Sequence, residues 1–320
     1  MRALIISGGG SKGAFAGGIA EYLINDCCNK YELFVGCSTG CLLLPHLALG
    51  KIEKIKKIYT SVSQEDIFSI SPFIIKKTKE GYETKINHFN SVLSFIKGHP
   101  TFGESLNLKK LIKKSITTDE FDRLRAENKK VIVTVSNLSL NQIEYYNSMD
   151  CDHENFCEWA WASSNYTPFM SLMTKNGFQY ADGGFGNFVP ISCAIENGAT
   201  EIDVIILENE VQTLHFPEVK NAFSLLFRTF QFMKNTNNSK DIIIGKLIGL
   251  NQNITINFYF TPNQLTENPL IFDPVEMTQW WKDGYEYAKS RQPDSFCHIP
   301  QNKNEDVEAD TKKDWIQEDE

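Results

Sequence analysis

The opening of the chain repeats one pattern twice: a short apolar segment leads into a glycine-rich turn, and the turn leads into a helix-forming segment. The first apolar segment, residues 2–7, precedes Gly8–Gly13, and the second, residues 31–35, precedes Gly36–Gly40. Strands that alternate with helices predict a parallel sheet with right-handed crossovers, in which ligands bind at the carboxyl ends of the strands. We therefore expect an α/β protein with a mainly parallel central sheet.

The rest of the chain extends this pattern and then changes character. Two further apolar segments rich in β-branched residues are expected to be buried strands, so one core should span residues 1–208. Residues 209–296 are expected to form an extension, with two helical stretches around a strand, packed on that core. Residues 297–320 are expected to be a disordered acidic tail, because Gln301–Glu320 holds eight acidic and three basic residues.

Charge and cysteine content restrict the partners and the compartment. A formal net charge of −8 argues against a general nucleic-acid-binding protein, which needs a basic surface to displace counterions. No secretory signal opens the sequence, and no apolar run reaches the roughly 18 residues of a membrane span. The eight cysteines lack the spacing of a small disulfide scaffold, so reduced thiols are expected. A soluble cytoplasmic protein is predicted.

One cysteine-rich segment could in principle bind a metal. Cys151 and Cys157 flank His153, but this pattern supplies three ligands at most and lies among competing carboxylates. We therefore predict no metal site in this chain.

The first glycine-rich loop, read GGGSKG, satisfies the G-x-G-x-x-G spacing between a strand and a helix. Such a backbone can direct successive N–H groups at an anion beside a helix N-terminus, whether a pyrophosphate or a developing oxyanion. The loop is not a Walker A motif, because Ala14 stands where the lysine should be. A nucleotide-binding or regulatory module that uses Gly8–Gly13 is therefore one alternative.

The second loop, Gly36–Gly40, reads G-x-S-x-G between a strand and a helix. In that context the flanking glycines permit a strained turn that presents the hydroxyl of Ser38 as a nucleophile. The alternative is a glycine-rich turn in which the serine only caps the helix.

A serine hydroxyl needs a base, and the histidines are poor candidates. His46 lies on the helix that follows Ser38 and is expected to point away from the turn, and none of the other five histidines has a motif around it. Asp182 instead follows a short strand-like segment and precedes Gly183 and Gly184, so its carboxylate can stand at a strand end with little crowding. Its alternative role is that of a β-turn aspartate.

Together these residues resemble the patatin-like phospholipase family: a glycine-rich loop with a basic residue, a G-x-S-x-G elbow and a D-G-G motif, in that order over residues 1–208. The resemblance implies a three-layer sandwich with helices on both faces of the sheet. It implies a Ser-Asp dyad, with Ser38 as nucleophile and Asp182 as base, and no cofactor. It further implies an oxyanion hole of Gly9, Gly10 and Ser11, supported by Gly8, Lys12, Gly13, Gly36, Gly40, Gly183 and Gly184.

The resemblance also implies the reaction. Ser38 would cleave carboxylic esters of phospholipids or lysophospholipids through an acyl-enzyme, and Lys12 would add positive charge near the oxyanion hole or near a lipid phosphate. The alternative for Lys12 is an exposed lysine at the start of the helix. A Ser-Asp-His triad with His215 or His298 remains an alternative, since these residues also follow Ser38 and Asp182. The α/β-hydrolase fold, in which such a triad occurs, places its serine several strands further into the chain.

Membrane contact is expected to be transient. One helical face is expected to pack on the sheet rather than to line an acyl channel or touch a bilayer; it comprises Phe223, Leu226, Phe227, Phe230 and Met233. Lysine clusters within residues 54–57, 76–79 and 109–114 could attract anionic lipid, and solvated surfaces explain them equally well.

Overall fold

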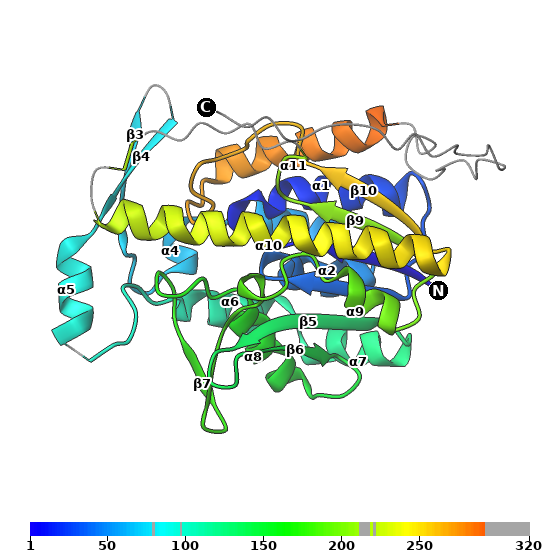
Figure 1. The fold of residues 1–320 in the computed structure, drawn as a ribbon, viewed down its shortest axis with the longest axis horizontal. Helices are drawn as coiled ribbons and strands as arrows, with labels where there is room; N and C mark the ends of the chain where they lie inside the picture. Colours follow the sequence, from blue (N-terminus) through cyan, green and yellow to red (C-terminus); the bar gives the residue numbers. More distant parts are fainter. Residues whose placement is uncertain (79–80, 97, 211–217, 220–221, 292–320) are drawn as a thin grey trace, which may run out of the picture.

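The computed structural model describes residues 1–78, 81–96, 98–210, 218–219 and 222–291 (Figure 1). Within these residues one sheet of eight strands forms the centre of the molecule. Five strands run parallel in the order β10-β9-β1-β2-β5. On the β5 side, β6 and β8 each pair antiparallel with β5, and β7 pairs antiparallel with β8. The strands are β1 (Arg2–Ile6), β2 (Leu33–Cys37), β5 (Lys130–Asn137), β6 (Gln142–Asn147), β7 (Met173–Lys175), β8 (Phe178–Asp182), β9 (Glu201–Ile206) and β10 (Thr255–Phe260).

Helices cover both faces of the sheet. They are α1 (Gly13–Asn25), α2 (Thr39–Ala48), α3 (Ile52–Tyr59), α4 (Gln64–Ile67), α5 (His88–Ile96), α6 (Leu106–Ser115), α7 (Thr118–Ala126), α8 (His153–Ser163), α9 (Ile191–Glu196), α10 (Ala222–Gln252) and α11 (Pro274–Ser290). Two short 3-10 turns, η1 (Gly10–Lys12) and η2 (Gly183–Phe185), and a separate hairpin of β3 (Phe73–Thr78) and β4 (Gly81–Ile86) complete the described elements.

The sheet is buried on both sides because its central strands are almost entirely apolar. Along β1, Leu4 and Ile6 belong to one core with α1 and α2, whereas Ala3 and Ile5 belong to a second core with α9. Neighbouring residues of a strand point to opposite faces, so the alternation places one core on each side. The molecule is thus a three-layer sandwich, and the α/β fold class predicted from the sequence is confirmed.

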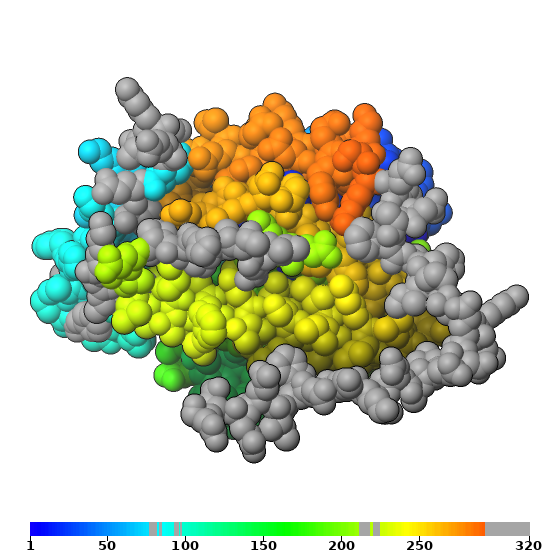
Figure 2. Space-filling model, turned by 45° about the horizontal axis from the view of Figure 1, so that its top comes forward, coloured from blue at the N-terminus to red at the C-terminus, as the bar shows by residue number. Residues whose placement is uncertain are grey.

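Residues beyond 208 continue the same sheet and its helical layers. β10 pairs in parallel with β9 at the sheet edge, and α11 packs against α1. The buried indole of Trp281 on α11 donates a hydrogen bond to Glu21 on α1 at 2.5 Å. Figure 2 shows the yellow surface of α10 beside the gold and orange surface of residues 255–291. None of the described helices is long and apolar enough to cross a membrane.

The pairing partners of β5 explain why the ends of β2 and β8 meet. β5 pairs with β2 through Lys130–Thr134 and with β8 through Val135–Asn137. β6 pairs with Ile132–Asn137 and overlaps both partners, so β2 and β8 must share the opposite edge of β5. They meet end to end there, because Cys37 is opposite Thr134 and Asp182 is opposite Val135.

Two element boundaries differ from the sequence prediction. β2 extends to Cys37, because its pairing with β5 continues past residue 35, and α2 begins at Thr39, so that Ser38 alone separates strand from helix. α10 runs from Ala222 to Gln252, well past Met233, the last residue of the apolar face described from the sequence.

Candidate active site

Ser38 occupies a strained turn at the carboxyl end of β2. Its φ and ψ are 52° and −120°, a conformation that side-chain-bearing residues rarely adopt. The turn is tight: a Cβ on Gly40 would lie 2.2 Å from the carbonyl oxygen of Ile6. The Ser38 N–H donates to Ser163 Oγ at 2.9 Å, and the Ser38 carbonyl accepts from Ser164 Oγ at 3.2 Å. The end of α8 therefore holds the turn in place.

Asp182 stands beside Ser38 because of the shared edge of β5. Its side chain is buried, with 4% of the residue exposed, and Oδ1 accepts the Gly184 N–H at 2.8 Å. Burial raises the pKa of Asp182 to about 6, although hydrogen bonds from the Ser38 side chain and from Gly184 act in the opposite direction. A carboxylate with that pKa is ionised at neutral pH and more basic than an ordinary aspartate, as a general base requires.

The first glycine-rich loop borders the same site. Gly10 has a φ of 57°, and a Cβ there would lie 2.2 Å from the Pro269 carbonyl oxygen. Among the described residues, the N–H groups of Gly9 and Gly10 have no hydrogen-bond acceptor. Ser11 differs, because its N–H donates to the Pro269 carbonyl at 2.9 Å and its hydroxyl to the same oxygen at 3.2 Å. Ser11 is therefore not available as the oxyanion donor that was predicted.

Lys12 is buried, with 6% of the residue exposed. Its ammonium group donates to Glu208 Oε1 at 2.8 Å and to the Leu207 carbonyl. Burial lowers the pKa of Lys12 to about 8, against the influence of Glu208. The alternative of an exposed helix-start lysine is wrong, because Glu208, two residues past the end of β9, pairs with Lys12 next to the end of β1. Lys12 anchors the glycine-rich loop to that neighbouring strand.

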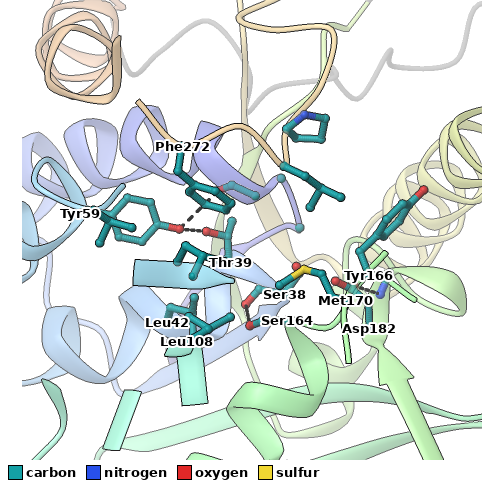
Figure 3. A pocket seen from close by; sticks show the side chains of 18 of the residues that line it. Ser38, Thr39, Leu42, Tyr59, Leu108, Ser164, Tyr166, Met170, Asp182 and Phe272 are labelled. Atoms are coloured by element: carbon teal, nitrogen blue, oxygen red, sulfur yellow. Dashed lines mark hydrogen bonds between the residues drawn. The ribbon is translucent and has the colours of Figure 1, made fainter. Parts of the chain in front are cut away.

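A cavity with about 1140 Å³ of empty space, including its mouth, opens at Ser38 and Asp182. Figure 3 shows the two residues near Tyr166, whereas Leu42, Tyr59, Leu108 and Phe272 line the region away from Asp182. The wall of that region is mostly apolar and also includes Ile55, Ile58, Val62, Ile67, Leu111, Ile112, Ile116, Leu270 and Met277. Gly8, Gly9 and Gly10 border the cavity near Ser38.

The remaining motif glycines support this arrangement. Gly36 lies within β2, and Gly13 begins α1 with its Cα beside the hydroxyls of Thr39 and Tyr59. Gly183 and Gly184 open η2 directly after Asp182. Phe188 fills the space above Gly8 and Gly184, where a Cβ would lie within 2.7 and 3.0 Å of its ring.

The apolar face expected on α10 serves more than one purpose. Leu226, Phe227 and Phe230 are half-buried against the core, as predicted, but Phe227 also lines the cavity. Met233 is 53% exposed. The side chain of Phe223 lies outside the described residues.

The other candidate residues are separate from this cavity or outside the described residues. His46 lies in the last turn of α2 and is buried, which lowers its pKa to about 4, and it does not line the cavity. His215 and His298 lie outside the described residues. His153 Nε2 lies 3.5 Å from Cys157 Sγ, but no group of three or more metal-ligating side chains occurs in the part of the chain that the structure describes.

Three residues of the site carry no motif in the sequence. Lys234 and Gln231 on α10 line the cavity, and Asp241 accepts the N–H groups of Phe188 and Val189 at 2.7 and 3.1 Å. Asp241 thereby fixes the segment that follows Asp182. Because α10 is remote in sequence from both glycine-rich loops, only the tertiary structure reveals these roles.

Two comparisons with known proteins give matches. A family model described as patatin-like phospholipase matches residues 4–195, more than half of the chain. The crystal structure of VipD from Legionella pneumophila is similar in fold, with a TM-score of 0.50 at 16% sequence identity. The match covers 90% of this chain and 66% of that chain, a little under two thirds of its length. No curated protein sequence matched the chain.

Proposed function

Because this chain belongs to the patatin-like phospholipase family, a family of lipid acyl hydrolases, we propose that it cleaves carboxylic esters of phospholipids or lysophospholipids with a Ser38–Asp182 dyad. The observation that supports the proposal is that both side chains lie in the wall of one largely apolar cavity. An apolar wall of this extent suits an acyl chain and offers little to a nucleotide, which argues against the nucleotide-binding alternative.

The proposed reaction uses only groups of this chain and water. Asp182 accepts the hydroxyl proton while Ser38 Oγ attacks the ester carbonyl carbon. The N–H groups of Gly9 and Gly10 receive the resulting oxyanion, and each such donor is worth about 2.7 to 4 kcal/mol in the transition state. Asp182 returns the proton to the departing alcohol, which leaves an acyl-enzyme on Ser38. Asp182 then deprotonates a water that attacks this ester, and the fatty acid leaves as the Ser38 hydroxyl is restored.

We expect the purified protein to release fatty acid from phospholipid or lysophospholipid and to bind one fluorophosphonate group per chain, because the probe reacts with an activated serine. Mass spectrometry locates the label and chromatography measures the released acid. His215→Ala and His298→Ala are expected to retain activity within about threefold, which the dyad requires. A histidine variant with no turnover would favour the triad, and a nucleotide-dependent melting shift without turnover would favour the binding module.

We propose that the protein acts in the cytoplasm and contacts membranes transiently through α5. Phe89, Val92 and Ile96 share one face of this helix, at spacings of three and four residues, and are 76%, 56% and 77% exposed. Figure 1 shows α5 at the end of the molecule opposite the N-terminus. α10 begins at the α5 end in the same view, and Phe227 near its start lines the cavity. An exposed apolar face there would bring the cavity to the lipid surface.

If α5 contacts the membrane, the double variant Phe89→Ser, Ile96→Ser is expected to bind phosphatidylcholine vesicles about tenfold or more weakly, as measured by sedimentation. Each apolar side chain that is fully buried in the bilayer contributes about 1.5 to 3 kcal/mol to binding. The matched control is Val275→Ser on α11, where Val275 is 72% exposed. Equal vesicle binding by the double variant and the wild type would contradict the assignment of α5.

A further inference from the structure

A second cavity lies next to the one at Ser38 and differs from it in chemistry. It has about 510 Å³ of empty space, including its opening. Most of its lining residues are polar; besides Lys12 and Lys234 they include Glu208, Glu267, Asn209, Asn235, Thr261, Gln264 and Thr266. Gln231, Lys234 and Pro269 line both cavities, so the two spaces meet at these residues. The site therefore has an apolar branch and a polar branch on either side of this shared wall.

Two buried ammonium groups share one buried carboxylate beside that shared wall, while Glu267 also lines the polar cavity and Asp182 the apolar one. Lys12 and Lys234 both donate to the same oxygen of Glu208, at 2.8 and 2.5 Å. The three side chains are 7%, 15% and 14% exposed, and one carboxylate balances only one of the two ammonium groups. Lys12 uses two of its three N–H donors, on Glu208 and the Leu207 carbonyl, whereas Lys234 uses one, on Glu208. Because Glu208 serves both ammonium groups, an anionic group of the substrate can take the N–H donors that Lys234 does not use.

We propose that the polar cavity is the head-group subsite and that Lys234 binds the phosphodiester of the lipid; this inference rests on the proposed function. When the ester carbonyl lies at Ser38 and the acyl chain fills the apolar branch, the leaving alcohol must point elsewhere. In a glycerophospholipid the phosphate is a few bonds from the ester, and Lys234 stands where the two branches meet. The amide and hydroxyl groups beyond it suit the rest of the head group.

Lys234 also lowers the pKa of Asp182, so a test must separate phosphate binding from an effect on the base. We compare 1-oleoyl-lysophosphatidylcholine with 1-oleoylglycerol at pH 7.5, because the two share the acyl chain and the glycerol and differ in the phosphate and its substituent. At this pH Asp182, with a pKa of about 6, is ionised.

Lys234→Met is expected to lower kcat/KM for the lysophospholipid by about ten- to a hundredfold, because a charged hydrogen bond is lost. For 1-oleoylglycerol, which has no phosphate, kcat/KM is expected to fall by less than about threefold. Lys234→Arg is expected to recover most of the lysophospholipid activity, because it restores the charge. The matched control is Lys240→Met, which removes an exposed lysine from the same helix. Glycerophosphocholine is expected to compete with the lysophospholipid in the wild-type protein.

An equal loss on both substrates would overturn the proposal, because Lys234 would then act on Asp182 or on the packing of α10. An unchanged kcat/KM on both would overturn it as well. If Lys234→Met does not fold, failure of glycerophosphocholine to compete in the wild type decides against the subsite. A wild-type protein that takes no fluorophosphonate and hydrolyses neither lipid would instead refute the proposed hydrolase function.

Discussion

Replacing Ser38 with alanine is expected to abolish fluorophosphonate labelling and to lower kcat by about four orders of magnitude or more, the usual consequence of removing a serine nucleophile. The remaining donors can still polarise a bound ester, but no acyl-enzyme can form. Intact mass spectrometry after incubation with the probe and fatty-acid release from lysophospholipid measure the two effects.

The fold should survive this change. Ser38 keeps its neighbours through its backbone, which bonds to Ser163 and Ser164, and alanine meets the same strain at a φ of 52° as serine does. Circular dichroism should therefore match that of the wild type. Ser11→Ala is the matched control, because its hydroxyl bonds to Pro269 rather than lining the cavity, and a loss below about tenfold is expected. Labelling that persisted in Ser38→Ala would place the nucleophile elsewhere.

The parts of the site that short sequence motifs describe could be predicted. The glycines around Ser38 and the glycines after Asp182 specify local backbone shapes, and these shapes need no knowledge of distant residues. The alternating pattern at the start of the chain likewise predicts the parallel sheet. What no local pattern contains is the register on β5, which places Asp182 opposite Val135 and so beside the end of β2.

Details that depend on distant partners could not be predicted. The N–H of Ser11 is taken by Pro269, 258 residues away, and Lys12 is drawn to Glu208 across a neighbouring strand. The apolar face described from the sequence ends at Met233, where polar residues follow, whereas α10 continues to Gln252. The polar stretch is a packing site: Asn237 donates to the Phe185 carbonyl at 2.9 Å, directly after the motif that holds Asp182.

Asp182→Asn is expected to remove activity and at the same time to stabilise the protein. Asparagine can still accept the Gly184 N–H, but it cannot take the proton of Ser38, so kcat should fall by about a thousandfold or more. In the wild type, kcat/KM should rise with pH and level off above about pH 6, where the carboxyl group is ionised. A profile that levels off near pH 4 would show that burial does not raise the pKa of the catalytic group.

The stabilisation follows from the same raised pKa. The pKa of Asp182 is about 6 in the folded protein and has its ordinary value of 3.8 when the chain unfolds, so the folded state binds the proton more tightly. The contribution of this group to the free energy of unfolding therefore falls by up to roughly 3 kcal/mol as pH rises from 3.8 to 6. Above pH 6 it stays at that lower value. Asparagine carries no charge to bury, so Asp182→Asn should raise the free energy of unfolding by up to about that amount at pH 7.5, and the gain should disappear near pH 4. Urea denaturation at both pH values measures the difference, and a variant less stable than the wild type at pH 7.5 would contradict the expectation that the ionised carboxylate is held at a cost to folding.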